Sequence, residues 1–271
     1  MNPWLINPVW QNVSSMCREI AAVGDSQNEV GRYHHLSSSL SFAIATIESF
    51  LNGRMRSHLE SRSDGALVQR KLRKGRFIEK LRGWPREILG TDLSLADSKI
   101  KEITSFYEIR CDLTHPKTSG HDVYETLETL NAENVKLAVA EYCVRFHEAE
   151  GSFYPYWLLG WNYFNPREDS QELYLINNQQ FLHSMTYLGF RVFGFEPLGT
   201  TWLRNNMSTF AGYLGLYKEL CQLSRCEPRD DQFPYKPILC RAWWATEHQR
   251  QCGNVTQEAI ERAIRIHRGK F

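Results

Sequence analysis

Residues 103–116 read ITSFYEIRCDLTHP, and this stretch decides how the rest of the chain is interpreted. A helix over it, at about 100° per residue, places four apolar side chains on one arc: Ile103, Phe106, Ile109 and Leu113. Arg110 falls inside the same arc, where a charged group needs a partner, an interface or a task, because burying an unpaired charge is costly. Pro116 disfavours helical geometry at His115, so we expect the helix to end at the histidine.

Arg110 and His115 together suit the chemistry of a phosphodiester. A guanidinium stays protonated and matches a phosphate with two parallel donors. An imidazole, with an ordinary pKa of about 6.5, can give or take a proton near neutrality. The two side chains are therefore candidate catalytic residues. The alternative is that Arg110 pairs with a carboxylate such as Glu48 or Glu108, and that His115 only ends a helix.

The arginine, four intervening residues and the histidine resemble the RxxxxH motif of the HEPN superfamily, the all-helical domains that include many toxin and antiviral ribonucleases. The flanking segments resemble the family too. They are residues 42–52 as its first helix, 77–81 and 88–90 as its second helix and exit loop, 99–115 as the motif helix, and 132–148 as the closing helix. One position departs from the family, which often has Asn, Asp or His directly after the arginine. This chain has Cys111 there, followed by Asp112.

The resemblance implies a fold and an activity. The expected fold class is mainly α, with a HEPN-like antiparallel helical bundle over residues 32–150 and a smaller α+β region after it. The expected activity is that of a metal-independent endoribonuclease without a cofactor, acting as a toxin or antiviral defence effector. Arg110 and His115 would be catalytic, and Asp112 and Thr114 would support them. The alternative is a non-catalytic HEPN module that binds RNA, nucleotide or a partner protein.

Expected partners follow from the same resemblance. RNA is the expected substrate, and an antitoxin or regulatory protein is a further candidate partner. A homodimer is expected because one chain supplies one motif histidine, whereas the reaction has two proton-transfer roles.

The charge distribution points to one basic segment. The formal net charge is +1, so any affinity for nucleic acid must come from a local patch. Residues 69–82 hold seven basic side chains against one acidic residue, Glu79. Five of them are the candidate RNA-binding residues Arg70, Lys71, Arg73, Lys74 and Arg76. A phosphate-binding strip is one interpretation of this stretch, and an ordinary solvated helix face is the other.

Cysteine usage and hydropathy favour a cytoplasmic protein with no membrane partner. No apolar run is long enough to span a bilayer, and the first residues lack the pattern of a secretory signal. The seven cysteines are odd in number and irregularly spaced, which favours reduced thiols. A zinc-stabilised regulator is a third hypothesis, disfavoured because no CxxC pair occurs. Its ligands would come from Cys221, Cys226, Cys240, Cys252, His248 and His267.

The pattern divides the chain into three parts. Residues 1–31 form a leader with a short helix near 13–23, which packs on a partner or on its own core. Residues 32–150 begin with a helix over 34–56, whose serines supply capping oxygens. Further on, Trp84-Pro85 ends or kinks a helix, Ser94 to Asp97 cap the motif helix, and 117–122 form a loop. Asn131 caps the closing helix, with Asn134 as the alternative cap. Residues 151–271 form an α+β domain of unknown role. It has strands 157–164 and 172–176 in a β-hairpin, and helices over 181–193, 202–220 and 256–267.

Overall fold

The computed structural model describes residues 7–61, 65–115, 122–164, 173–174, 181, 200–223 and 238–239. The chain divides into two compact units, residues 1–152 and 153–271. The described residues are mainly α-helical, which confirms the expected mainly α class. None of the described helices has both the length and the apolar character needed to cross a membrane.

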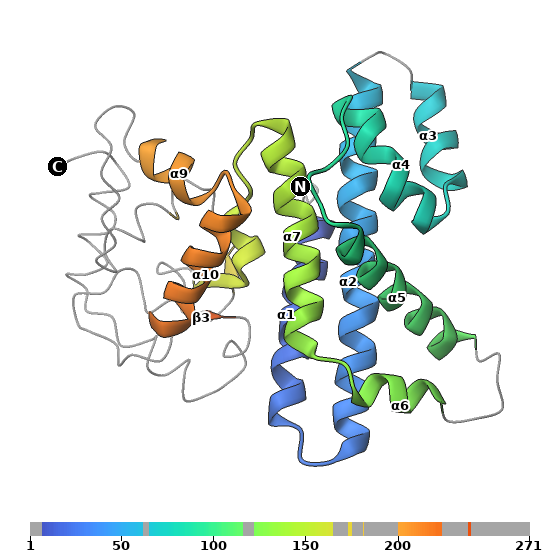
Figure 1. Ribbon diagram of the computed structural model, residues 1–271, viewed down its shortest axis with the longest axis vertical. Helices are drawn as coiled ribbons and strands as arrows, with labels where there is room; N and C mark the ends of the chain where they lie inside the picture. Colours follow the sequence, from blue (N-terminus) through green and yellow to red (C-terminus); the bar gives the residue numbers. More distant parts are fainter. Residues whose placement is uncertain are drawn as a thin grey trace, which may run out of the picture. The chain divides into compact units, whose positions relative to one another are not determined.

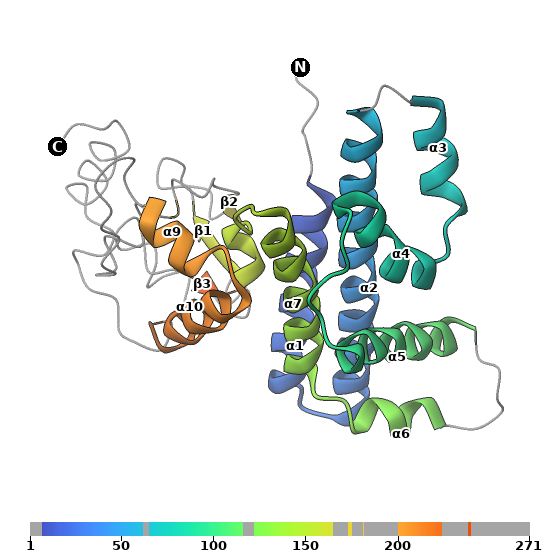
Figure 2. The same ribbon diagram turned by 45° about the horizontal axis from the view of Figure 1, so that its top comes forward.

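The first unit is a set of helices arranged around one long helix. Its described helices are α1 (Pro8–Asp25), α2 (Glu29–Glu60), α3 (Gly65–Lys74), α4 (Phe77–Leu89), α5 (Asp97–Thr114), α6 (Asp122–Glu128) and α7 (Ala132–Glu150). Helices α1, α2 and α7 run side by side, and α5 crosses α2 obliquely (Figures 1 and 2). Helices α3 and α4 pack near the end of α2, and α6 packs near its start.

Helix α2 is longer at both ends than the expected span of 34–56. Asn28 is its N-cap, and the side-chain carbonyl accepts a hydrogen bond of 2.8 Å from the amide of Gly31. The expected capping role of the serines is wrong. Ser37 and Ser41 lie inside the helix, where their hydroxyls donate to the carbonyls of His34 and Ser37. Nearly every apolar side chain on one face of α2 is buried, including Leu36, Leu40, Ile47, Leu51 and Met55.

The leader contains a helix that packs on the chain's own core. Asn7 caps α1, accepting from the amides of Val9 and Trp10 at 3.1 and 3.2 Å. Val13, Met16 and Cys17 are buried where α1 packs against α2. The helix covers 8–25 rather than the expected stretch near 13–23.

Pro85 does not end the helix at Trp84 but lies inside α4. A proline within a helix removes the amide that would bond to the carbonyl four residues earlier, here Leu81. The hydroxyl of Tyr142, on α7, donates to that carbonyl at 2.9 Å. This bond is buried and replaces the missing one, so α4 continues to Leu89. Gly90, with φ of 75°, then ends it in the left-handed conformation.

The motif helix α5 ends where the sequence predicts and begins differently. His115 is its C-cap, with φ of −137° and ψ of 73°. Its N-cap is Ala96, which makes no side-chain cap, so the expected capping by the side chains of 94–97 is wrong. Asp97 still stands in the first turn, where a negative charge favours the helix. The expected loop over 117–122 lies outside the described residues, except that Asp122 already begins the short helix α6.

Helix α7 is capped as expected, and Asn131 accepts from the amide of Glu133 at 2.9 Å. Most of the helix is buried, including Val135, Val139, Tyr142 and Phe146. Gly151, at φ of 70°, ends it and takes the chain towards the second unit.

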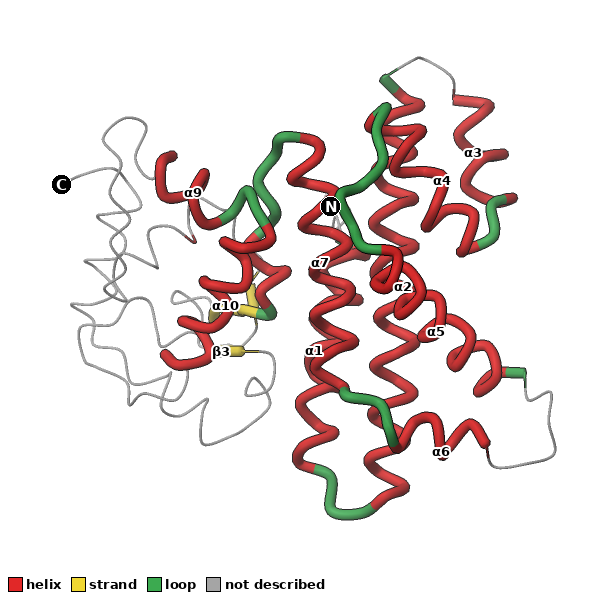
Figure 3. The backbone as a smooth tube through the Cα atoms, in the orientation of Figure 1, coloured by secondary structure: helices red, strands yellow, loops and turns green. Residues whose placement is uncertain are grey.

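The second unit has short described elements: η1 (Tyr156–Leu159), β1 (Trp161–Phe164), β2 (Leu173–Tyr174), α9 (Thr200–Asn206), α10 (Phe210–Leu223) and β3 (Ile238–Leu239). Strand β1 pairs antiparallel with β2 and with β3, in the order β2-β1-β3. Among the described residues, strands occur in this unit alone (Figure 3). Residues 165–172 lie outside the described residues, so the β-hairpin stays a prediction.

Two other expectations for the second unit are corrected. The strand expected over 157–164 begins only at Trp161, because 156–159 form a turn of 3₁₀-helix that ends at Gly160 with φ of 75°. The helix expected over 202–220 is two helices, α9 and α10. Tyr154 is bonded to the break between them. Its hydroxyl donates to the carbonyl of Asn206 at 2.6 Å, and its amide donates to the carbonyl of Met207 at 2.9 Å. Of the helix expected over 181–193 only Phe181 is described, and the one over 256–267 lies outside the described residues.

The bond from Tyr142 to Leu81 can be tested by a double-mutant cycle. Replacing Tyr142 by Phe leaves a buried carbonyl without a donor, so the free energy of unfolding should fall by roughly 1–3 kcal/mol. In a Pro85→Ala background the amide of residue 85 can bond to Leu81, and the same change should cost clearly less. Urea denaturation of the four proteins measures both costs. Equal costs in the two backgrounds would show that the hydroxyl does not replace the proline's missing amide.

Candidate functional site

The last turn of α5 presents the candidate residues at the rim of the first unit. Ile103, Phe106 and Ile109 are buried, as the apolar arc predicts. Further along the same face Leu113 is only half-buried, and Arg110 is half-buried beside it. The apolar face of α5 is therefore buried at its start and only half-buried near its C-terminal end. The guanidinium of Arg110 lies near the surface rather than in the interior.

Tyr107, one turn before Arg110, fixes this part of α5 against α4. Its ring stacks on Phe77 with 4.8 Å between ring centroids and an interplanar angle of 19°. A hydrogen bond with the thiol of Cys111, and then burial, raises the pKa of the Tyr107 hydroxyl, whereas the positive charge of Arg110 opposes the rise. The guanidinium thus lies close enough to influence the phenol, and Cys111 is engaged with Tyr107.

The expected alternative partner of Arg110 is engaged elsewhere. Glu48 accepts from the ammonium of Lys80 at 2.6 Å, and Lys80 also donates to Asn52 at 3.1 Å. Lys80 is 2% exposed, and its ammonium lies 5.2 Å from the centroid of the Trp84 ring. This buried cation is therefore paired with a carboxylate, a side-chain amide and an aromatic face. In the part of the chain that the structure describes, Arg110 forms no ion pair with Glu48 or Glu108.

Thr114 and His115 make their hydrogen bonds with the backbone at the C-terminal end of α5. The hydroxyl of Thr114 donates to the carbonyls of Arg110 and Cys111 at 2.9 and 3.1 Å, so it closes the last turn of the helix. The amide of His115 donates to the carbonyl of Cys111 at 2.8 Å, and its side chain is exposed. Asp112 is half-buried on the same turn. The structure therefore brings all the predicted motif residues to one end of α5.

Five residues of α-helix would place His115 about 7.5 Å along the axis from Arg110 and about 140° around it. His115 has left helical geometry, so its direction is set by the C-cap rather than by the helix. The arrangement places a half-buried guanidinium and an exposed imidazole at one end of α5. A guanidinium can hold an anion, and an imidazole can move a proton.

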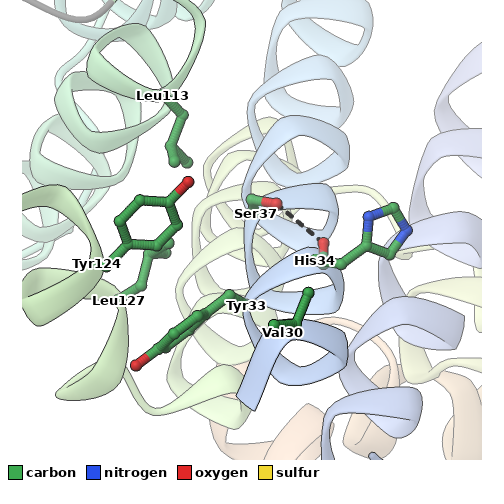
Figure 4. A pocket seen from close by; sticks show the side chains of 7 residues that line it. All are labelled: Val30, Tyr33, His34, Ser37, Leu113, Tyr124 and Leu127. Atoms are coloured by element: carbon green, nitrogen blue, oxygen red, sulfur yellow. Dashed lines mark hydrogen bonds between the residues drawn. The ribbon is translucent and has the colours of Figure 1, made fainter. Parts of the chain in front are cut away.

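A hollow of about 620 Å³ opens beside the end of α5, and we name it the aromatic recess. Its lining residues are Val30, Tyr33, His34, Ser37, Leu113, Tyr124 and Leu127. The rings of Tyr33 and Tyr124 lie 5.5 Å apart at 48°. Figure 4 shows Leu113 pointing towards the hydroxyl of Tyr124, so the recess reaches the motif turn.

The sequence analysis missed the aromatic recess because it predicted a loop that ends at Asp122 and no helix over the residues of α6 that follow. The signal that could have found it is the spacing of Val123 and Leu127, one helical turn apart and close to Tyr124. Leu127 is fully buried, whereas Tyr124 is 44% exposed and Val30 78% exposed. The recess therefore has an apolar floor and an open aromatic rim.

The basic segment forms a second hollow, of about 710 Å³, which we name the basic groove. It lies between α3 and α4 and is lined by Leu67, Arg70, Lys71, Lys74, Gly75, Glu79, Gly83, Trp84 and Glu87. Of the five candidate RNA-binding residues, Arg70, Lys71 and Lys74 line the groove. Arg73 and Arg76 are exposed outside its lining.

Two acidic side chains, Glu79 and Glu87, also line the basic groove and partly offset its positive charge. Lys71 pairs with Glu87 at 2.8 Å. The carboxylate of Glu79 accepts from the amide of Arg76 at 3.1 Å, which caps α4. Arg70 and Lys74 thus provide the exposed positive charge of the groove.

The zinc hypothesis falls mostly outside the described residues. This holds for Cys226, Cys240, Cys252, His248 and His267, whereas Cys221 is half-buried on α10. None of the described cysteines forms a disulfide bond. Burial raises the pKa of the Cys143 thiol to about 12, so that thiol is unreactive.

A second titratable cluster lies between α2 and α7. The guanidinium of Arg54 donates to Nε2 of His147 at 3.0 Å and to the carboxylate of Glu150 at 3.1 Å. The other ring nitrogen of His147 lies 2.8 Å from the Ser152 hydroxyl, which in turn donates to Glu150 at 2.6 Å. These bonds close a ring only if the imidazole is neutral, accepts at Nε2 and donates at Nδ1. His147 is 5% exposed, and this closed arrangement leaves it no free position for a substrate.

No protein-family model, curated protein or solved structure matches this chain.

The cluster at His147 makes stability depend on pH. Burial, and then the charge of Arg54, lowers the pKa of His147 from 6.5 to about 3. Between these values the unfolded ring binds a proton and the folded ring does not, so acid favours unfolding. We expect the free energy of unfolding to fall from pH 6.5 towards pH 3, by up to about 1.4 kcal/mol per pH unit from this residue.

Urea denaturation at a series of pH values measures this effect. A His147→Gln variant should show a shallower decline than the unsubstituted protein, whereas His58→Gln on α2 should keep the original slope. The same pH dependence in all three proteins would contradict the assignment.

Proposed function

We propose that this chain is a metal-independent endoribonuclease of the HEPN type. The observation that carries the proposal is the end of α5, where a half-buried Arg110 and an exposed His115 belong to the same turn as Leu113, which lines the aromatic recess. The order of the helices supports it as well. The segments that resemble the HEPN first, second, motif and closing helices fall within α2, α4, α5 and α7, which pack on one another.

The reaction would be transesterification within RNA. The 2′-hydroxyl attacks the adjacent phosphorus, the bond to the 5′-oxygen breaks, and a 2′,3′-cyclic phosphate forms. His115 would take the proton from the 2′-hydroxyl or give one to the leaving oxygen, and Arg110 would stabilise the charge on the phosphoryl oxygens. A homodimer would supply a second His115, so that one imidazole acts as base and the other as acid.

The two hollows suit single-stranded RNA. Unpaired bases stack on aromatic side chains, and Tyr33 and Tyr124 offer such faces close to the motif turn. Phosphates bind basic side chains, and Arg70 and Lys74 are exposed at the basic groove. The biological role in this proposal is that of a cytoplasmic toxin or antiviral effector restrained by an antitoxin or regulatory protein.

The catalytic part of the proposal is tested with single-stranded RNA in the presence of EDTA. Removing a proton-transfer group costs about a hundredfold or more in rate, so His115→Ala and Arg110→Ala should each lose at least that much. Arg110→Lys, which keeps the charge but not the two parallel donors, should retain part of the activity. His58→Ala is the matched control and should cut like the unsubstituted protein. RNA left intact by the unsubstituted protein, or cut equally by the two alanine variants, would exclude the ribonuclease.

RNA binding by the basic groove is tested separately. The double variant Arg70→Gln and Lys74→Gln should bind RNA more weakly. The dependence of its logarithmic affinity on logarithmic salt concentration should be shallower by about 0.7 for each phosphate that the protein no longer neutralises. Arg56→Gln with Lys101→Gln removes the same charge from exposed positions elsewhere and should leave that slope unchanged. Equal slopes for both double variants would remove the groove from the proposal.

A non-catalytic HEPN module is the second candidate. The engagement of Cys111 with Tyr107, at the position where the family often has a polar residue, favours it. RNA binding without cleavage, unchanged in His115→Ala but abolished in the Arg70 and Lys74 double variant, would support this function instead.

A further inference from the structure

Three side chains of metal-ligating types meet on the surface where α1 packs against α2, and none of them is a residue of the motif turn. They are Glu19 on α1 and the consecutive residues His34 and His35 on α2. One ligand atom from each residue lies within 4.8 Å of the others. We propose that Glu19, His34 and His35 bind a divalent transition-metal ion, zinc in the first instance, which links α1 to α2.

The geometry is close to that of a bound ion. Since no two of the atoms are more than 4.8 Å apart, one point lies within roughly 2.8 Å of all three, whereas zinc bonds to His nitrogen and carboxylate oxygen measure about 2.0–2.2 Å. Small changes of side-chain rotamer close that difference. The two imidazole rings lie 5.2 Å apart between centroids at 73°, so the ring planes are not stacked and their nitrogens can converge on one ion.

Two of the three proposed ligands, Glu19 and His35, already contact each other in the absence of an ion. Nδ1 of His35 lies 2.7 Å from a carboxylate oxygen of Glu19. That distance is a hydrogen bond, and it is shorter than the separation of two ligand atoms on one tetrahedral ion. On binding, the metal takes the position of the Nδ1 proton, which is released, and the two atoms move slightly apart.

The scaffold and the exposure also suit a metal. Helices α1 and α2 are capped at Asn7 and Asn28 and pack along their length, so the backbone positions of the ligands are fixed. Glu19 and His35 are 25% and 30% exposed in their side chains, and His34 is exposed, so an ion can enter from solvent. In Figure 4 the ring of His34 points away from Tyr33 and Tyr124, so it does not close the aromatic recess.

The ligand set decides the class of metal. Two imidazoles and one carboxylate suit zinc and its neighbours rather than calcium or magnesium, which prefer oxygen ligands alone. Three protein ligands leave a fourth position for water. His34 also lines the aromatic recess, but the proposed RNA chemistry uses no metal and its catalytic residues are Arg110 and His115. Zinc binding and RNA cleavage can therefore be measured separately.

The test uses the whole chain without an affinity tag, freed of metal by a chelator that is then removed. Calorimetric titration with zinc should show a site that Glu19→Gln and His34→Gln weaken tenfold or more, whereas His58→Gln leaves it unchanged. Zinc should raise the melting temperature of the unsubstituted protein and of His58→Gln but not of the other two variants, because binding to the folded state alone stabilises it.

Cobalt separates this site from any cysteine site in the same chain. Cobalt bound to nitrogen and oxygen gives visible absorption bands without the near-ultraviolet charge-transfer band of a thiolate ligand. We expect one equivalent of such cobalt in the unsubstituted protein and none in His34→Gln. Equal zinc affinity and equal cobalt spectra in the unsubstituted protein and the Glu19 and His34 variants would overturn the proposal. No zinc binding tighter than millimolar would overturn it as well.

Discussion

The first unit depends on one constraint, the burial of α2 by its neighbours. Each of the other described helices of this unit, α1 and α3 to α7, packs directly against it. A helix this long is stable only if tertiary contacts cover its apolar face, and Leu36, Leu40, Ile47 and Leu51 are fully buried in those contacts. The candidate helix α5 takes its direction from the same contact surface, so the position of Arg110 is a consequence of how α2 is covered.

Polar bonds between distant residues complete this core. The hydroxyl of Tyr142 donates to the Leu81 carbonyl, which Pro85 leaves without an amide donor. Glu48 and Asn52 accept hydrogen bonds from the buried ammonium of Lys80. Such groups would be costly to bury alone, but they stabilise and orient the helices once they are paired. Lys80 in turn lies over Trp84, which lines the basic groove, so the floor of that groove is anchored to α2.

Local patterns in the sequence predicted the main features of the first unit. Apolar spacing predicted α2, α5 and α7, Asn131 predicted a cap, and Pro116 predicted that the helix ends at His115. The features that could not be predicted depend on residues far apart in the chain. In α4 the carbonyl that Pro85 leaves without an amide donor is paired with Tyr142 of α7, and the aromatic recess lies where α2, α5 and the short α6 meet. The ring of bonds around His147 likewise joins α2 to the end of α7.

The length of α2 has a consequence for the size of any substrate. The aromatic recess includes Ser37, whereas the basic groove is tied through Lys80 to Asn52, so the two hollows are related to points about 22 Å apart along the helix axis. A mononucleotide is too small to contact both. A strand that did so would have to extend over several nucleotides. For the proposed activity, this spacing favours an oligonucleotide over a single nucleotide.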